Sequence, residues 1–386
     1  MRAGVVGLSL AALVALATPA AAQLPAPPVG ASDAFQAGGY AAVTFSRPEH
    51  PEQVERPEVS ELAAAVLGWG RIVPRLSYLV EVDMAKRTTE TWTGREADQR
   101  LVPVRAYLEY TRSDLLRVRA GRFLTPVGQW NEGHAEPLTW TPTRPLTTYR
   151  PFAKSLTGLL AAGQGTVAGR DAGYALFWSP SARLEGHVED EEESSFVHAV
   201  GGRVAAEIRP GTGFGVSLAE VRRSRPGTGA AAETDTPGAL QALDRRRLFG
   251  EISPSGTPAR AEAAEDGDVE EREEDDRTRL LVAADLRWER PGMEWLAEGV
   301  WLPATEHAPS EGGAFAQGAV RIGGPVWAVG RLERFRPVDG HGVTVGYAGV
   351  TVRAGSHLVV KLGRQLVRRP SERIPDGWFL SFSSLF

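Results

Sequence analysis

Trp378-Phe379-Leu380-Ser381-Phe382-Ser383-Ser384-Leu385-Phe386 closes the sequence, and this stretch decides the fold that we expect. Alternate residues of a β-strand point to opposite faces, so every second position belongs to one face. Counting back from the last residue, that face consists of Phe386, Ser384, Phe382, Leu380 and Trp378. It is apolar at four of five places, which predicts an amphipathic strand that is apolar on one side.

The opposite end predicts export. Arg2 gives a positive start, residues 5–17 are apolar, and Ala20-Ala21-Ala22 forms a small-x-small cleavage site. We therefore expect a signal peptide over residues 1–22 and a proline-rich tether over residues 23–37, since proline cannot donate to a sheet. A membrane anchor is the alternative, but the apolar run is about thirteen residues and a spanning helix needs roughly twenty.

The composition narrows the class of protein. The chain has no cysteine, which suits an oxidising compartment and removes thiolate nucleophiles and cysteine metal sites. No later stretch is apolar for about eighteen residues, so helical membrane spans are excluded. The net charge is −5, and acidic residues concentrate in residues 183–194 and 262–276. We expect solvated loops there; divalent-cation binding is the alternative.

Period-two alternation recurs along the whole chain. Strand four, for example, is expected to place Val102, Val104, Ala106, Leu108 and Tyr110 outward. About sixteen strands are predicted, at approximately residues 38–46, 60–72, 76–83, 102–111, 116–120, 157–165, 172–179, 196–209, 214–223, 280–289, 294–302, 314–322, 326–336, 343–353, 357–369 and 378–386.

Long and short connections alternate between these strands, the longest being an insertion over residues 224–276. This pattern is typical of an antiparallel transmembrane β-barrel, which we expect over residues 38–386. The barrel must close, because unpaired backbone groups in lipid cost several kcal/mol each. Sixteen strands also leave room for an aqueous lumen. A secreted β-sandwich is the alternative, but it does not account for the last strand.

The last strand resembles the C-terminal signal by which bacterial outer-membrane proteins are recognised for barrel insertion. Trp378, Leu380, Phe382 and Phe386 carry the resemblance, and Ser384 departs from the aromatic residue usual at its place. The resemblance implies a location in the bacterial outer membrane. It also implies the barrel-assembly machinery, outer-membrane lipid and lipopolysaccharide as partners.

The long connection after the fifth strand contains Thr125-Pro126-Val127-Gly128-Gln129-Trp130-Asn131-Glu132-Gly133-His134-Ala135-Glu136-Pro137-Leu138-Thr139-Trp140. With Ala120-Gly121-Arg122-Phe123-Leu124 before it, this stretch resembles proteins related to the phosphate-selective porins, specifically over residues 117–151. The resemblance implies a porin, usually a homotrimer, whose third loop folds into the lumen. It also implies passive diffusion of small hydrophilic solutes or ions. Phosphate-selective members use a lysine cluster, whereas this chain has three lysines, so selectivity for phosphate is not carried over.

The resemblance and the alternation together give candidate site residues. The expected pore constriction consists of Trp130, Asn131, Glu132, Glu136, Arg144 and Arg150. The expected pore lining consists of Arg105, Glu109, Arg117, Arg119, Arg331, Glu333 and Lys361. Selectivity follows the charges at the narrowest section, so we expect a weak anion preference, opposed by Glu132 and Glu136. Alternatively, the arginines pair with acids on neighbouring strands.

Other functions are less well supported. The histidines are scattered, and the sequence contains no Gly-x-Ser-x-Gly elbow or His-Glu-x-x-His pair, so we do not expect an enzyme. We expect no cofactor, no metal and no nucleic-acid partner. A closed outer-membrane barrel acting as a receptor, adhesin or structural anchor is the alternative to a channel.

Overall fold

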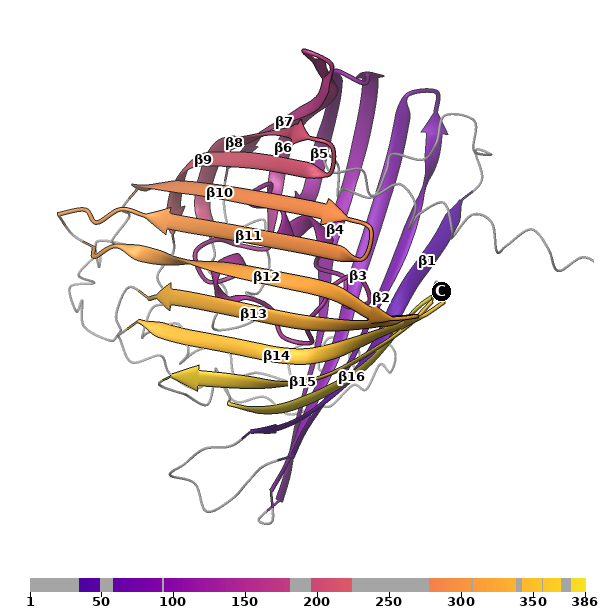
Figure 1. Cartoon of the computed structure of the whole chain (residues 1–386). Coiled ribbons are helices and arrows are strands. Elements are labelled where there is room, and N and C mark those ends of the chain that lie inside the picture. Colours follow the sequence, from indigo (N-terminus) through magenta and orange to yellow (C-terminus); the bar gives the residue numbers. More distant parts are fainter. Residues whose placement is uncertain are drawn as a thin grey trace, which may run out of the picture. The chain divides into compact units, whose positions relative to one another are not determined.

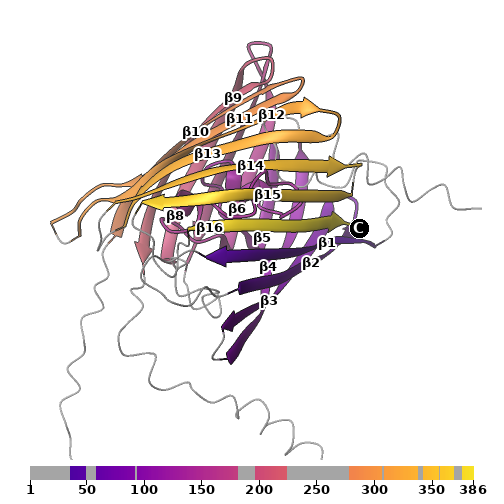
Figure 2. The same cartoon turned by 60° about the horizontal axis from the view of Figure 1, so that its bottom comes forward.

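The computed structural model describes residues 35–48, 58–91, 94–180, 196–223, 278–306, 308–337, 342–355, 357–368 and 376–386. They form sixteen antiparallel strands in one closed sheet, in which each strand pairs with its neighbours in sequence and β1 pairs with β16 (Figures 1 and 2). The predicted antiparallel barrel of about sixteen strands is therefore confirmed. The expected signal peptide, the residues of the tether before Phe35, and residues 224–276 lie outside the described residues.

The strand bounds agree with those expected from alternation to within a few residues at most positions. The strands are β1 Gln36–Pro48, β2 Glu58–Val73, β3 Leu76–Thr91, β4 Gly94–Ser113, β5 Leu116–Leu124, β6 Ser155–Val167, β7 Arg170–Ser179, β8 Phe196–Arg209, β9 Thr212–Arg223, β10 Thr278–Arg290, β11 Met293–Leu302, β12 Glu311–Gly323, β13 Val326–Arg336, β14 Val343–Ala354, β15 Leu358–Arg368 and β16 Gly377–Leu385.

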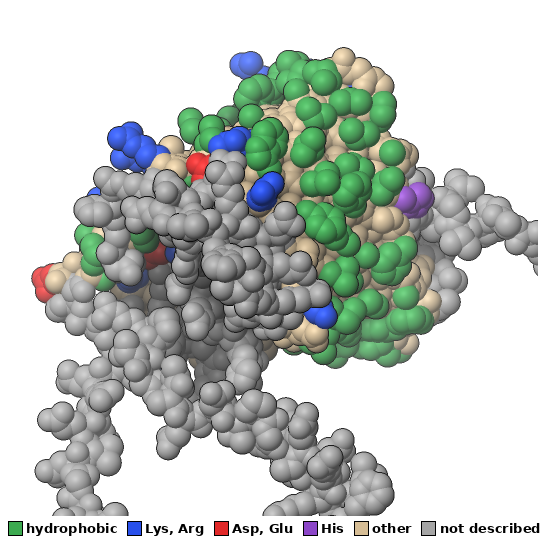
Figure 3. Space-filling view, turned by 90° about the horizontal axis from the view of Figure 1, so that it is seen from below, with side chains coloured by type: hydrophobic (Ala, Val, Ile, Leu, Met, Phe, Trp, Pro, Cys, Tyr) green, Lys and Arg blue, Asp and Glu red, His purple; other side chains and the backbone are tan. Residues whose placement is uncertain are grey.

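Alternation along each strand separates an apolar outside from a buried inside. On β10, Leu280 and Leu286 are 48% and 43% exposed, whereas Leu281 and Asp285 between them are buried. The same pattern on the other strands gives an apolar outer surface (Figure 3). Exposed apolar side chains over many adjacent strands are what a barrel in lipid requires.

Tight turns connect alternate strand pairs at one end of the sheet. Pro210-Gly211 and Pro291-Gly292 form two of these turns, and the two glycines have φ of 72° and 79°. This left-handed region is open to glycine without a steric penalty, which allows the chain to reverse within two residues. Neighbouring strands that are not joined by such turns are connected at the opposite end of the barrel.

The β3–β4 connection departs from the expected alternation of long and short connections. Pairing continues as far as Thr91 opposite Gly94, so two elongated strands stand where a long loop was expected. The outward assignment of Val102 and Val104 is wrong. The register shifts opposite Glu81, and Val104 is fully buried beside the inward Arg105. A β-bulge places two residues against one and so changes the phase of alternation, which the sequence pattern alone does not reveal.

The last strand closes the barrel. Phe386 and Gly39 exchange two backbone hydrogen bonds, each of 3.0 Å. A Cβ atom at Gly39 would lie 2.8 Å from the Phe386 ring, so the ring covers the glycine. Trp378, Phe382 and Phe386 are 48%, 42% and 58% exposed, and Leu380 is half-buried, as the predicted outward face requires.

Candidate functional site

The β5–β6 connection, residues 125–154, folds into the barrel. Its only regular elements are two short 3₁₀ helices, η1 Trp130–Gly133 and η2 Leu146–Thr148. The described helices include none long and apolar enough to cross a membrane. Figures 1 and 2 draw the connection within the ring of strands, and its backbone and side chains form hydrogen bonds with β9 and β11–β16 on the far wall. The predicted inward fold of the third loop is therefore confirmed.

Asn131 holds the two ends of the loop together. Its amide Nδ2 donates to the carbonyls of Thr125 and Lys154, each at 2.9 Å, and the residue is fully buried. The Thr125 amide also donates to the Lys154 carbonyl at 2.9 Å. Lys154 in turn forms an ion pair of 3.0 Å with Asp83 on β3. The loop therefore begins and ends at adjacent positions, which these hydrogen bonds hold together.

Glu298 on β11 receives the outgoing half of the loop. Its Oε2 atom accepts hydrogen bonds from the backbone amides of Gln129 and Trp130, at 2.9 and 3.0 Å. Gly128 makes this approach possible, because a Cβ atom there would lie 2.0 Å from the carboxylate and the residue has φ of 67°. The carboxylate is buried, and two amide donors offset its loss of water.

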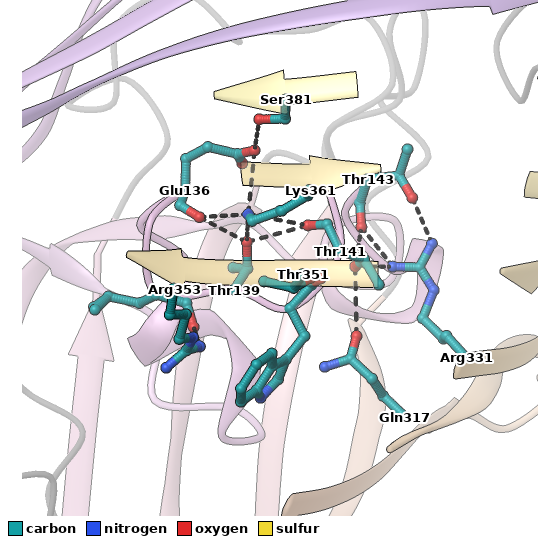
Figure 4. A network of polar contacts seen from close by, with 12 residues as sticks. Glu136, Thr139, Thr141, Thr143, Gln317, Arg331, Thr351, Arg353, Lys361 and Ser381 are labelled. Carbon is teal, nitrogen blue, oxygen red and sulfur yellow. Dashed lines mark hydrogen bonds and ion pairs between the residues drawn. The ribbon is translucent and has the colours of Figure 1, made fainter. Parts of the chain in front are cut away.

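Three alternate threonines of the loop face strands β13 and β15 (Figure 4). Arg331 donates to the hydroxyls of Thr141 and Thr143, each at 2.8 Å. Thr143 also donates to Gln365 at 2.9 Å. Thr139 is the third member, 2.8 Å from the Lys361 ammonium. The three hydroxyls, at alternate positions of the loop, therefore all contact polar side chains of β13 and β15.

Lys361 on β15 fixes the loop next to the barrel seam (Figure 4). Its ammonium donates to the Glu136 carbonyl at 2.5 Å and forms an ion pair of 3.3 Å with the Glu136 carboxylate. Ser381 on β16 donates to the same carboxylate at 3.1 Å. The Lys361 side chain is fully buried, so it stands under the loop rather than on an open lumen.

The aromatic side chain of Trp140 packs on the wall between these anchors. Its ring centroid lies 4.8 Å from that of Trp327, and the Arg353 guanidinium lies 3.7 Å from the ring centroid. Thr351 donates to the Trp140 carbonyl at 2.9 Å. A cation over an aromatic face is a favourable contact, and here it holds the Trp140 ring against β13 and β14.

Arg144 organises the returning half of the loop. Its guanidinium lies 5.1 Å from the Trp130 ring centroid and 5.3 Å from that of Tyr149. It also donates to Asn131 Oδ1 at 3.2 Å and to the Thr148 carbonyl at 2.6 Å. The predicted constriction residues Trp130, Asn131 and Arg144 therefore lie together, inside one folded loop.

Glu333 on β13 holds η2. Its Oε1 atom accepts hydrogen bonds from the amide and the hydroxyl of Thr147, each at 2.9 Å. Leu146 packs beside it in an apolar cluster with Phe335 and Val345. Glu333 and Arg331 were predicted to line the pore; the structure places both on the interior face, buried against the loop.

The remaining predicted lining residues form a charged row on β4 and β5. Arg105 pairs with Glu81, and Arg119 pairs with Glu109, in both cases with the partner on the adjacent strand. For Arg105 and Arg119, the structure therefore shows the alternative stated above, in which arginines pair with acids on neighbouring strands. Arg117 also faces inward and is half-buried. Of the loop residues, Glu132 and Arg150 are half-buried, and Arg150 lies 5.9 Å from the Tyr149 ring centroid.

His134 lies in the loop beside this charged row. Burial, followed by the nearby charges of Lys154, Arg105 and Arg144, holds the pKa of the His134 imidazole well below its usual range. Its Nδ1 atom lies 3.0 Å from the Asn131 carbonyl, so the neutral ring donates from Nδ1. Its Nε2 atom lies 3.8 Å from Glu81, whose other oxygen is held by Arg105.

An apolar cluster inside the barrel was not expected. Phe123, Leu156, Leu160 and further interior residues of β5–β11 are buried together, and Val127 and Phe152 of the loop pack into them. The predicted pore lining consists of charged residues only. The structure has these charged residues on one part of the interior and the apolar cluster on another. The physical reason is that the two ends of the loop bury apolar side chains, which need an apolar wall to pack on.

Sequence reasoning missed Glu298, Gln317, Gln365, Thr351 and Ser381 as contacts of the loop. Two signals were available. Glu298 occupies an inward position between the inward Leu296 and Val300. A carboxylate among apolar inward residues needs a polar partner, and that partner is the loop. The alternation Thr139-Trp140-Thr141-Pro142-Thr143 predicts an extended segment with one hydroxyl face.

Solved structures similar to this one are bacterial outer-membrane porins. OmpF of Salmonella typhi, in a complex with daunomycin, is 10% identical, matches 91% of this chain and 97% of its own, and has a TM-score of 0.57. OprB of Pseudomonas putida, in a low-pH structure, is 6% identical, matches 92% and 93%, and has a TM-score of 0.50. No family model matches the sequence. No curated protein matches it either. The likeness shows that the chain has the fold of a porin.

Proposed function

We propose that this protein is a porin, a passive diffusion channel for small hydrophilic solutes or ions in the bacterial outer membrane. The observation that carries the proposal is the inward loop, which is fastened to the far wall by Glu298, Arg331, Glu333 and Lys361. A closed receptor or anchor barrel needs no loop held across its interior. A channel uses such a loop to set its narrowest section, where size and charge are sorted.

We also propose that the channel has a weak preference for anions. Glu136, one of the two acids that oppose it, is paired with Lys361 at 3.3 Å. Arg144 and Arg150 lie against aromatic rings in the loop, and Arg117 faces inward on β5. Guanidinium groups on aromatic rings stay charged and attract anions, whereas a paired carboxylate repels them weakly.

Selectivity for phosphate does not form part of the proposal. Two of the three lysines are committed, Lys154 to Asp83 at 3.0 Å and Lys361 to Glu136 at 3.3 Å. Lys86 lies on the outward face of β3, so it does not contribute to a cluster inside the barrel. The resemblance to relatives of phosphate-selective porins over residues 117–151 therefore supports a channel of this general type.

Partners follow from the proposed location. We propose that the barrel-assembly machinery inserts the chain, with Trp378, Leu380, Phe382 and Phe386 as the recognised face of β16. Outer-membrane lipid and lipopolysaccharide would then surround the apolar outside, and three copies would associate. The two hydrogen bonds between Phe386 and Gly39 support the first point, because loss of the last residue would weaken barrel closure.

Swelling of liposomes tests the diffusion of neutral solutes. Vesicles that contain the purified protein are placed in isotonic solutions of sugars of increasing size. We expect rapid swelling with pentoses and progressively slower swelling with larger sugars, as a fixed constriction requires. Vesicles that swell no faster than protein-free ones, although they contain folded barrel, would favour the closed receptor, adhesin or anchor.

A further inference from the structure

Arginine and tryptophan side chains gather inside the barrel where the inward loop meets β12–β14. Arg321, Trp327 and Thr351 are paired in register on these three strands, and Arg353 lies two residues further along β14, toward its tight-turn end. The loop rests on this row, because Thr351 donates to the Trp140 carbonyl at 2.9 Å. We call the following residues of the wall and the loop the turn-side cluster: Arg321, Trp327, Arg353, Leu138 and Trp140.

Each indole of the turn-side cluster carries one guanidinium. Arg321 lies 4.8 Å from the ring centroid of Trp327, and Arg353 lies 3.7 Å from that of Trp140. The two indoles contact each other, with ring centroids 4.8 Å apart. Both indoles are buried, whereas Arg321 is exposed and Arg353 is half-buried. The cation–aromatic contacts therefore hold two positive groups at fixed places over a buried aromatic base.

Positive charge exceeds negative charge around these two guanidiniums. Among the described residues, neither Arg321 nor Arg353 forms an ion pair with a carboxylate. Glu294 of β11 acts on Arg353 from a greater distance, and its charge is shared with Arg287 of β10. Arg353 donates from Nη2 to the Leu138 carbonyl at 3.3 Å, and its Nε atom is buried without an acceptor. The cluster thus has unused capacity to bind an anion.

Leu138 supplies an apolar surface next to the Arg353 guanidinium. It is 47% exposed although it belongs to the inward loop, and its neighbours Pro137 and Thr139 are buried. Covering an exposed leucine with another apolar group is favourable, by about 25 cal/mol for each Å² removed from water. A positive group that lacks an acceptor therefore adjoins an apolar group that lacks a cover, and an amphipathic anion satisfies both.

We propose that the turn-side cluster binds organic monocarboxylates that carry an apolar ring, such as benzoate and cyclohexanecarboxylate. The carboxylate would accept paired hydrogen bonds from the Arg353 guanidinium, including one from Nε, and Arg321 would add its attraction. The ring would lie against Leu138. An inorganic anion cannot cover the leucine, and a neutral sugar does not use the excess positive charge. Such a solute would be held next to the narrowest section of the channel, and this consequence rests on the proposed function.

Fluorine NMR of 4-fluorobenzoate with the detergent-solubilised full chain tests the inference. Line broadening reports binding whether or not the barrel conducts, and protein-free micelles give the baseline at the same ionic strength. We expect the wild type to broaden the signal and benzoate or cyclohexanecarboxylate to reverse the broadening. Acetate, inorganic phosphate, benzyl alcohol and glucose should need concentrations at least roughly tenfold higher for the same effect.

Substitution of the two arginines tests the contribution of charge. We expect Arg321→Gln/Arg353→Gln to weaken 4-fluorobenzoate binding by roughly tenfold or more. Arg321→Gln alone should weaken it by a smaller factor, and it leaves the contact of Arg353 with the loop in place. The matched control is Arg112→Gln/Arg290→Gln, which removes two exposed arginines at the tight-turn end and should bind like the wild type.

Leu138→Ser separates the apolar contribution from the charge. We expect it to reduce the preference for benzoate over acetate, whereas Leu115→Ser, at an exposed position of the β4–β5 turn, should keep that preference. Unchanged binding in the double arginine variant would overturn the inference. So would displacement of 4-fluorobenzoate by acetate or inorganic phosphate as readily as by benzoate, which indicates a free-anion site, or by benzyl alcohol as readily, which indicates an apolar site.

The inference and the proposed channel fail in different ways. A barrel that binds 4-fluorobenzoate with this preference but conducts no ions would contradict the proposed channel and leave the binding site standing. A conducting barrel that does not broaden the 4-fluorobenzoate signal beyond the micelle baseline would overturn the binding site alone.

Discussion

Glu109 and Arg119 face each other on β4 and β5, and both side chains are buried inside the barrel. An ion pair in such a place contributes little net field while both partners are present. Removal of one partner leaves the other as an uncompensated charge near the path of permeating ions. The pair is therefore a place where the sign of the local field can be changed without large changes in shape.

We predict opposite shifts in ion selectivity for the two single substitutions of this pair. Arg119→Ser leaves the Glu109 carboxylate unpaired, so the reversal potential in a salt gradient should move toward cation preference. Glu109→Gln leaves the guanidinium unpaired and should move it toward anion preference. The double variant should return close to the wild type. If both single variants moved the reversal potential in the same direction, the electrostatic assignment would be wrong.

The His134 imidazole gives the loop a dependence on pH. Its folded-state pKa is lowered by burial, whereas the unfolded chain has the ordinary value of about 6.5. As the pH falls below that value the unfolded state binds a proton that the folded state does not, so stability is lost on acidification. The loss is up to about 1.4 kcal/mol per pH unit between the two pKa values.

We therefore predict that the thermal midpoint falls on going from pH 8 to pH 5, and falls less in His134→Gln. Circular dichroism of the detergent-solubilised barrel measures both. Glutamine retains a side-chain donor for the Asn131 carbonyl and cannot titrate. An equal fall in the two proteins would assign the dependence to other groups and would refute this role of His134.

At the scale of elements, the strands follow from local pattern and the loop anchors do not. Alternation locates a strand because each strand repeats the same signal over many residues, as β10 does. The bulge at Val104 and the extension of β3 and β4 depend on pairing between strands, which no single strand encodes. The contact of Glu136 with Lys361 joins residues 225 apart. Which wall the loop reaches depends on barrel closure and loop course, so its partners could not be predicted.

Lys361→Met tests the anchor at β15. The substitution removes the ammonium that contacts Glu136 and Thr139, and leaves the polar groups of the loop without a partner. We expect a loss of about 1–3 kcal/mol in stability and larger current fluctuations in single-channel records, because the loop is less firmly held. Lys86→Met, at an exposed position of β3, serves as the control. Quiet currents and full stability in the Lys361 variant would contradict the anchor.

Gly128→Ala tests the anchor at β11. The residue has φ of 67°, which costs alanine about 1–2 kcal/mol, and the added Cβ atom would lie 2.0 Å from the Glu298 carboxylate. We expect a lower thermal midpoint and altered conductance. Gly133→Ala is the matched control in the same loop, since a Cβ atom there meets no atom within 4 Å. Similar behaviour of the two variants would mean that the approach to Glu298 does not position the loop.

At the scale of the whole molecule, the described residues combine three features: a closed sheet, an apolar outside and an interior crossed by an anchored loop. Closure satisfies every strand edge, and the apolar outside suits lipid. These two features are common to all membrane barrels. The loop is the feature that separates a sorting channel from a closed barrel, so the account depends on whether ions pass it.

Planar bilayer recording of the purified wild-type protein tests this central claim most directly. With equal salt on both sides, the account predicts discrete and stable conductance steps as single proteins insert. In a salt gradient it predicts a reversal potential on the side of weak anion preference. A folded, heat-modifiable barrel that enters the bilayer and gives no conductance steps would contradict the account.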